Sequence, residues 1–165
     1  MPGLPVALMC LLGVLPCVGD GAVMDHRTAE IVSGSGNRWF LATGLALPVL
    51  EGRPREARET LEGFVLTAAA TQLLKHWTRS RRPDGSDHLS FPSGHTSAAF
   101  SIAATRSVHR PGEAPLWLAG AATIGASRVV LNRHRPEDVL AGAAIGIGFG
   151  ASAAGARILR FAVRF

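Results

Sequence analysis

Two basic residues, Lys75 and Arg82, could together bind a phosphate group. Six residues separate them, and Pro83 follows Arg82. A guanidinium holds two phosphate oxygens in a planar fork, whereas a lysine supplies a movable point charge. Two cations at the end of a helix also fit a simple interaction with the helix dipole, so this pair alone is not decisive.

A second group, Pro92-Ser93-Gly94-His95, directly precedes an apolar run. The unpaired backbone N–H groups at the start of a helix form a ready anion site. Ser93 can cap the helix or donate to a ligand, Gly94 allows close approach of the backbone, and His95 can donate a proton. The alternative is an ordinary Ser-Gly helix start with a bystander histidine.

A third group consists of Ser127-Arg128, then His134 after five residues and Asp138 after three more. Pro136 suits the first turn of a helix, which places Asp138 one turn inside and within reach of His134. A carboxylate on one imidazole nitrogen fixes the tautomer and leaves the other nitrogen free to attack. Asp138 alone could equally serve the helix dipole, but the set is harder to explain that way.

Two imidazoles and a carboxylate can also bind zinc, and the candidates are His95, His134 and Asp138. Three neighbouring cations would repel a divalent metal but offset the charge of a phosphate; they are Lys75, Arg82 and Arg128. We therefore expect no metal. The other histidines, expected at the surface or an interface, are His26, His76, His88 and His109.

Together the three groups resemble the type 2 phosphatidic acid phosphatase family, which shares its site with vanadium-dependent haloperoxidases and bacterial acid phosphatases. All of the family's motif positions are filled, by Lys75, Arg82, Pro83, Pro92, Ser93, Gly94, His95, Ser127, Arg128, His134 and Asp138. The resemblance continues through residues 139–142 and covers roughly the second half of the chain. It implies an all-α fold, an antiparallel bundle of five to six helices like the acid phosphatases and haloperoxidases.

The resemblance also implies a role for each residue. His134 would attack phosphorus to form a phosphohistidine, Asp138 would orient the imidazole, and His95 would protonate the leaving oxygen. The phosphate oxygens would be bound by Lys75, Arg82, Ser93, Gly94 and Arg128. The mechanism that the resemblance implies requires no organic cofactor either.

Uncharged runs predict the helices that must position these groups, over residues 39–50, 63–74, 96–105, 114–127 and 139–156. A polar stretch, 20–38, precedes them, and the Arg- and Glu-rich segment 51–62 lies between the first two. Short loops make consecutive helices antiparallel, so all three polar groups are expected at one end of the bundle. Gly142, Gly146 and Gly150 give the last helix a small-residue face for close packing.

Residues 1–19 contain no charged side chain and are expected to be a signal peptide or a first membrane helix. Residues 20–165 are expected to form a single phosphatase domain. The net charge of +5 suits an anionic partner, but the arginines lie at the ends of apolar runs rather than in a stripe with aromatics. We therefore expect no nucleic-acid binding. The apolar runs indicate a membrane-embedded or membrane-associated protein, although several are shorter than the roughly 20 residues that a span needs.

Several arginines are expected at the bundle end opposite the site: Arg53, Arg55, Arg58, Arg106, Arg110, Arg157, Arg160 and Arg164. By the positive-inside rule that end would be cytoplasmic. This predicts a bacterial cell-envelope protein, in the inner membrane with its active site facing the periplasm, or periplasmic. The expected partner is a phosphorylated lipid or a small phosphate ester. The alternatives are a soluble periplasmic acid phosphatase and, less favoured, a vanadium haloperoxidase.

Overall fold

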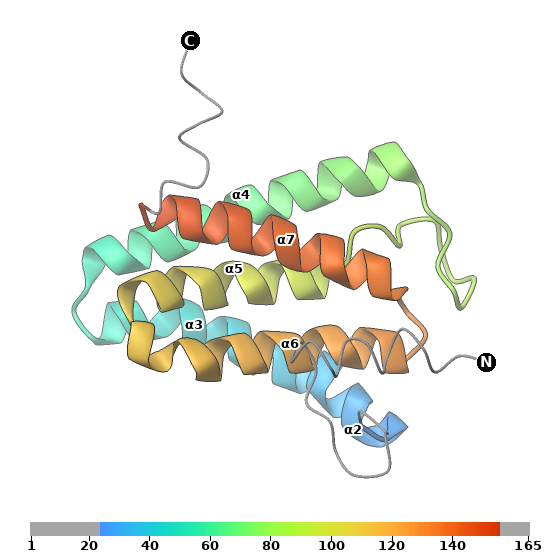
Figure 1. The fold of residues 1–165 in the computed structure, drawn as a ribbon, viewed down its shortest axis with the longest axis horizontal. Coiled ribbons are helices and arrows are strands. Elements are labelled where there is room, and N and C mark those ends of the chain that lie inside the picture. The colour runs from blue at the N-terminus through green and yellow to red at the C-terminus, as the bar shows by residue number, and fades with distance from the viewer. Residues whose placement is uncertain (1–23, 156–165) are drawn as a thin grey trace.

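The computed structural model describes residues 24–155, and this part of the chain is helical without any strand (Figure 1). Its elements are α2 (His26–Ile31), the π-helical turn η2 (Val32–Gly36), α3 (Asn37–Leu50), α4 (Pro54–Thr78), α5 (Gly94–His109), the 3₁₀ turn η3 (Pro111–Glu113), α6 (Ala114–Val130) and α7 (Pro136–Ala153). Within the described range, five longer helices and the short α2 thus form the expected all-α bundle.

Two segments expected to lie outside helices are helical. The charged segment 51–62 was predicted to separate helices, but from Pro54 onward it forms the first turns of α4. Proline suits the first turn of a helix, and Arg and Glu are good helix formers, as the Arg55–Glu59 pair at 2.9 Å illustrates. Likewise, part of the polar stretch 20–38 forms α2, whose first turn Asp25 caps by accepting from the Thr28 N–H at 3.0 Å.

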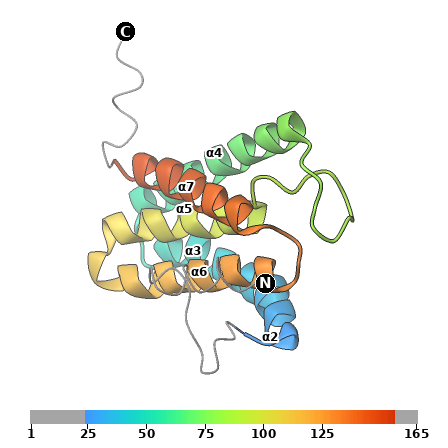
Figure 2. The same cartoon turned by 45° about the vertical axis from the view of Figure 1, so that its right-hand side comes forward.

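Helix α5 is the central element of the bundle. Figures 1 and 2 both show it between α6 and α7, and every residue from Ala99 to Arg106 is buried. The apolar core gathers around it, comprising Ala99, Phe100, Ile102, Ala103, Trp117, Ala121 and Ile124. Because α5 begins at Gly94, this packing places the Ser93-Gly94-His95 group.

Helix α7 packs against α5 with almost no space between the two backbones. A Cβ atom added to Gly146 would lie 2.3 Å from the Ser97 carbonyl oxygen, and one on Gly150 would lie 2.2 Å from that of Ser101. At Gly142 the corresponding distance to the Ser93 carbonyl oxygen is 2.7 Å. The small-residue face predicted from the sequence is therefore the contact that sets the spacing of the two helices.

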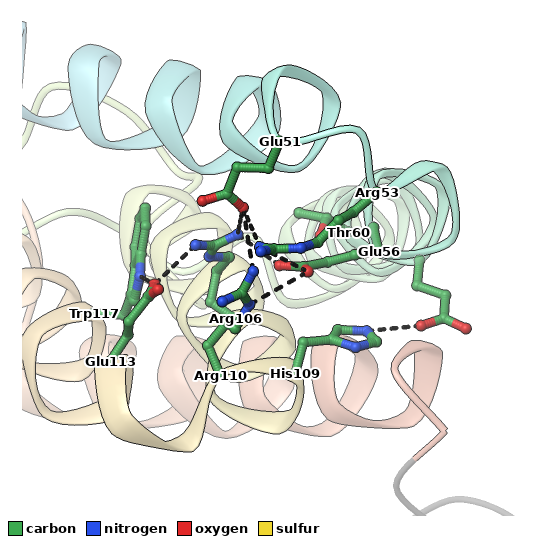
Figure 3. A network of polar contacts seen from close by, with 10 residues as sticks. Glu51, Arg53, Glu56, Thr60, Arg106, His109, Arg110, Glu113 and Trp117 are labelled. Atoms are coloured by element: carbon green, nitrogen blue, oxygen red, sulfur yellow. Dashed lines mark hydrogen bonds and ion pairs between the residues drawn. The ribbon is translucent and has the colours of Figure 1, made fainter.

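The far end of the bundle is closed by a buried ion-pair network around Arg106 (Figure 3). Arg106 is 1% exposed, and its guanidinium donates to Glu56 at 2.5 Å and to Glu113 at 2.8 Å. It also lies 5.3 Å from the centre of the Trp117 ring. Arg106 was expected among the arginines at this end and does lie here, but its burial in the last turn of α5 pairs it with carboxylates instead of leaving it at the surface.

Other predictions concern the remaining histidines and the two ends of the chain. His109 was expected at the surface or an interface, yet it is half-buried and its Nε2 lies 2.7 Å from Glu59. His26, His76 and His88 are exposed as expected. Arg157, Arg160 and Arg164, like residues 1–19, lie outside the described residues.

Between residues 24 and 155, no helix is both long enough and apolar enough to cross a bilayer.

The α5–α7 contact makes a prediction about stability. Gly146→Ala forces a methyl group against the α5 backbone, and we expect it to lower the free energy of unfolding by about 3 kcal/mol. Gly148→Ala is the matched control on the same helix, because a Cβ there meets nothing within 4 Å. Urea unfolding followed by circular dichroism measures both variants. Equal midpoints for the two would contradict the role assigned to this contact.

Candidate active site

The three polar groups meet at one end of the bundle, where α4 and α6 end and α5 and α7 begin (Figure 1). The helix order had predicted this convergence. Direct contacts connect the groups: the Ser93 N–H donates to the Asp138 carbonyl at 2.9 Å, and Arg82 reaches His134 at 3.2 Å. Residues 63 positions apart in the sequence, Lys75 and Asp138, thus belong to one site.

His134 is placed by the turn that follows α6. Asn132 adopts a left-handed conformation with φ 54°, which reverses the chain. The N–H groups of Arg133 and His134 then donate to the Arg128 carbonyl at 3.0 and 3.2 Å. These bonds fold His134 back over the last turn of α6, where its side chain is only 3% exposed.

Asp138 lies in the first turn of α7, as the position of Pro136 predicted. Its Oδ2 atom is 3.5 Å from the His134 Nδ1, longer than an ordinary hydrogen bond. On the other side of the ring, Nη1 of Arg82 lies 3.2 Å from Nε2. Because a guanidinium can only donate, Nε2 is assigned as the acceptor and Nδ1, facing Asp138, carries the proton of the neutral ring.

The surroundings keep His134 neutral. Burial, followed by the positive charges of Arg82, Arg128 and Lys75, lowers its pKa to about 3. The Asp138 carboxylate opposes this shift with a smaller effect. The neutral imidazole has a lone pair on Nε2, which is the form that a nucleophile requires.

Lys75 and Arg82 are held in place by the link between α4 and α5. The Lys75 ammonium donates to the carbonyl oxygens of Leu89 at 2.5 Å and Ser90 at 3.3 Å. Burial, with Arg82 next in importance, lowers the pKa of Lys75 to about 8. Arg82 uses its Nε to donate to Asp87 at 2.7 Å, which leaves the outer part of its fork directed at His134.

Arg128, in the last turn of α6, is 9% exposed. Its guanidinium donates to the hydroxyl of Ser33, which belongs to η2. Burial lowers the pKa of Arg128 to about 10, with Arg82 and Arg133 acting in the same direction. Three half-buried or buried cations therefore share this site, an arrangement that suits a multiply charged anion.

The start of α5 contributes Ser93, Gly94 and His95. Ser93 occupies the N-cap position, but its side chain does not cap the helix as expected; its hydroxyl instead accepts from Thr96 at 2.9 Å. The Gly94 backbone lies beside Lys75, whose Cε would be 3.7 Å from an added Cβ. Burial, followed by the positive charges of Arg128, Arg82 and Lys75, lowers the pKa of His95 to about 4.

No group of three His, Cys, Asp or Glu side chains with metal-binding geometry occurs among residues 24–155. The arrangement instead surrounds one neutral imidazole with three cations and a helix N-terminus. Such an arrangement has the charge to bind a phosphoryl group and a neutral imidazole that could serve as a nucleophile.

Comparison with known proteins agrees with this chemistry. Residues 57–158, more than half of the chain, match the PAP2 superfamily. The chain belongs to the PAP2 superfamily. This confirms the resemblance to type 2 phosphatidic acid phosphatases that the three motifs indicated.

Two curated relatives and one solved structure are similar to this PAP2 chain. It is 42% identical over 89 residues to lipid A 1-phosphatase of Porphyromonas gingivalis, a match that covers 52% of this chain but only 20% of that protein. It is 31% identical over 122 residues to decaprenylphosphoryl-5-phosphoribose phosphatase of Mycobacterium tuberculosis, covering 68% of each. The crystal structure of Aquifex aeolicus LpxE shares the fold, with a TM-score of 0.60 and 23% identity over 84% of this chain and 98% of that one.

The PAP2 match contains all the predicted site residues, but the structure adds three that the motifs did not reveal. Asp87 holds Arg82, and Ser90 donates to Asp138 at 2.6 Å. Ser33 contacts Arg128 from outside the matched range. Asp87 had a weak signal, an acid five residues after Arg82, whereas Ser33 lies in a stretch that had been interpreted only as polar.

The charge of this PAP2 site makes a prediction about pH. Both His95 and His134 have folded-state pKa values below the roughly 6.5 of an unfolded histidine. Between those values the unfolded chain binds more protons, so stability should fall as pH drops from about 6.5 to about 4. A bound anion favours the protonated rings, and inorganic phosphate or vanadate should reduce this loss.

Thermal unfolding midpoints from pH 4 to 8, with phosphate or with chloride of matched ionic strength, test this prediction. Histidine proton NMR in the same series should show the pKa of His95 rising when phosphate binds. An equal effect of chloride and phosphate would contradict a specific anion site.

Proposed function

We propose that this chain is a phosphatase that hydrolyses a phosphate monoester or diphosphate, most favourably of a lipid, through a phosphohistidine on His134. The observation that carries the proposal is the neutral His134 ring, with Asp138 at 3.5 Å on Nδ1 and Arg82 at 3.2 Å on Nε2. A buried imidazole with a free lone pair beside three cations has the charge and geometry for attack on phosphorus.

In the proposed first step, the Nε2 lone pair of His134 forms a bond to phosphorus while the bond to the leaving oxygen breaks. Asp138 stabilises the positive charge that develops on the ring, and His95 gives its proton to the leaving oxygen. The non-bridging oxygens are bound by Lys75, Arg82, Arg128, Ser93 and the Gly94 N–H. In the free protein the Arg82 guanidinium contacts Nε2. When the substrate enters, this guanidinium leaves Nε2 and donates to the phosphate oxygens instead.

His95 needs the substrate in order to act as an acid. In the free site, burial and then the three cations lower its pKa to about 4. The negative charge of a bound phosphate opposes those cations and favours the protonated ring. In the second step, water attacks the phosphohistidine, His95 takes up the proton of that water, and inorganic phosphate is released. The scheme requires no metal or organic cofactor.

Two observations support a lipid substrate. The two curated relatives are a lipid A 1-phosphatase and a decaprenylphosphoryl-5-phosphoribose phosphatase. Helix α4 also exposes a row of apolar side chains along one face, Leu61, Val65, Leu66, Leu73 and Trp77. Trp77 is 83% exposed in the last turn of α4, at the end of the bundle that carries the site, so an acyl or isoprenyl chain lying on this face would start from that end of the bundle.

These features favour a cell-envelope enzyme associated with a membrane. We propose a bacterial inner-membrane location with the site facing the periplasm, or a periplasmic one, and residues 1–19 as the signal peptide or first membrane helix. The positive-inside argument for this orientation is weaker than the sequence suggested, because Arg106 is neutralised within the fold.

The lipid substrate can be tested with two phosphate esters. We expect phosphate release from phosphatidic acid in mixed micelles, and Trp77→Ser should reduce it about tenfold, because ~1.4 kcal/mol of apolar contact is lost. Hydrolysis of a small aryl phosphate should be unaffected. Leu116→Ser is the matched control, since Leu116 is 76% exposed at the start of α6, away from the site. Activity on the aryl phosphate alone, in the soluble fraction, would favour the acid phosphatase.

The mechanism is tested by removing the nucleophile. His134→Ala should lower kcat by at least about 1,000-fold, since no other group takes its place. Phosphohistidine is hydrolysed in acid but survives in base. The phosphoenzyme of the wild type is therefore trapped by a rapid quench into base. His76→Ala is the control because His76 is exposed on α4.

The wild type should be indifferent to a chelator and inhibited by vanadate. Full activity of His134→Ala would disprove the assignment, and halide oxidation with added vanadate would identify a haloperoxidase instead.

A further inference from the structure

Ser90 is a buried serine that the three motifs do not include. It lies in the link between α4 and α5, two residues before Pro92, and is 0% exposed. Its hydroxyl donates to Oδ2 of Asp138 at 2.6 Å, across 48 residues of sequence. A hydroxyl that donates to a carboxylate at this distance forms a strong, charge-assisted hydrogen bond.

The oxygen that Ser90 contacts is the one that faces the nucleophile. Oδ2 of Asp138 also accepts from the Arg135 N–H at 2.9 Å and lies 3.5 Å from Nδ1 of His134. The contact to the imidazole is the longest of the three. The position of this oxygen relative to His134 is therefore set by the two shorter bonds, one from the α7 backbone and one from Ser90.

The backbone N–H and carbonyl groups of Ser90 both form hydrogen bonds. Its N–H donates to the Ser80 carbonyl at 2.9 Å, and its own carbonyl accepts from the Lys75 ammonium at 3.3 Å. One residue thus connects a phosphate-binding cation with the carboxylate that faces His134. A hydroxyl fixed in this way can hold the carboxylate in a single orientation.

We propose that Ser90 is a positioning residue for the proposed reaction, acting through Asp138. Its hydroxyl holds Oδ2 where it favours the Nδ1–H tautomer of His134, which leaves the Nε2 lone pair free for attack. Ser90 itself does not touch the phosphate and forms no covalent bond. The inference rests on the proposed phosphohistidine function, but it concerns an orientation that can be measured without turnover.

The kinetic test is a double-mutant cycle with Ser90→Ala and Asp138→Asn. Ser90→Ala alone should lower kcat by about 10- to 100-fold, as loss of a supporting hydrogen bond typically does, with KM changed less than about twofold. In the Asp138→Asn background, Ser90→Ala should lower kcat by less than about twofold, because the group that Ser90 positions is already altered. Equal losses in both backgrounds would overturn the proposal and leave Ser90 a purely structural residue.

Ser101→Ala is the matched control, because Ser101 is also a fully buried serine and lies within α5, two turns beyond the start of the helix. It should retain wild-type kcat and KM. Thermal unfolding of all variants establishes that they are folded at the assay temperature.

A second measurement does not depend on activity. Nitrogen-15 NMR of the His134 ring is recorded in an Arg82→Ala background, because Arg82 at Nε2 favours the Nδ1–H tautomer by itself. It should report the Nδ1–H tautomer with Ser90 present and a substantial Nε2–H population after Ser90→Ala. If the wild type hydrolyses no phosphate ester, the proposed function fails, and the tautomer comparison still decides the role of Ser90. An unchanged tautomer in Ser90→Ala would overturn that role even in an active enzyme.

Discussion

The close contact between the backbones of α5 and α7 is the constraint on which the rest of the structure depends. Helix α5 supplies Ser93, Gly94 and His95 at its start, and α7 supplies Asp138 in its first turn. Glycines on α7 bring the helices so near that the Ser93 N–H donates directly to the Asp138 carbonyl. A larger residue in this interface would separate His95 from Asp138, although neither residue had changed.

A second constraint is electrostatic. Lys75, Arg82 and Arg128 lie close enough that each lowers the proton affinity of the histidines between them. This repulsion is a cost to the empty protein, and the helix packing elsewhere must offset it. Fixed charges that need no rearrangement during the reaction are what stabilise developing negative charge on a transferred phosphoryl group. The three positive charges of the site are thus already in place before an anion binds.

Much of this arrangement could be predicted from the sequence because local signals dominate it. Uncharged runs located α3 to α7, Pro136 located the start of α7, and the antiparallel order predicted which helix ends meet. The failures have a common cause. The charges of segment 51–62 were interpreted as a connection between helices, yet in α4 Arg55 is exposed and its partner Glu59 is buried on the other side of the same ion pair.

Contacts between distant residues were harder to predict. Arg106 shows no sign in the sequence that it will pair with Glu56, 50 positions earlier, and such pairing depends on which helix faces meet. Ser90 and Ser33 were missed for the same reason, since a serine near a motif is common and its hydroxyl has many possible partners. The residues that perform chemistry have recognisable spacing, whereas those that hold them in place do not.

The contact between Ser33 and Arg128 has a consequence for variation among related enzymes. Ser33 belongs to η2, upstream of the region that defines the superfamily, yet its hydroxyl is bonded to a cation at the centre of the site. A change in this amino-terminal segment can therefore redirect one arginine and alter anion affinity while all three motifs stay intact. Two members with identical motifs need not bind the same headgroup with equal strength, and the difference would be found in a part of the chain that motif comparison ignores.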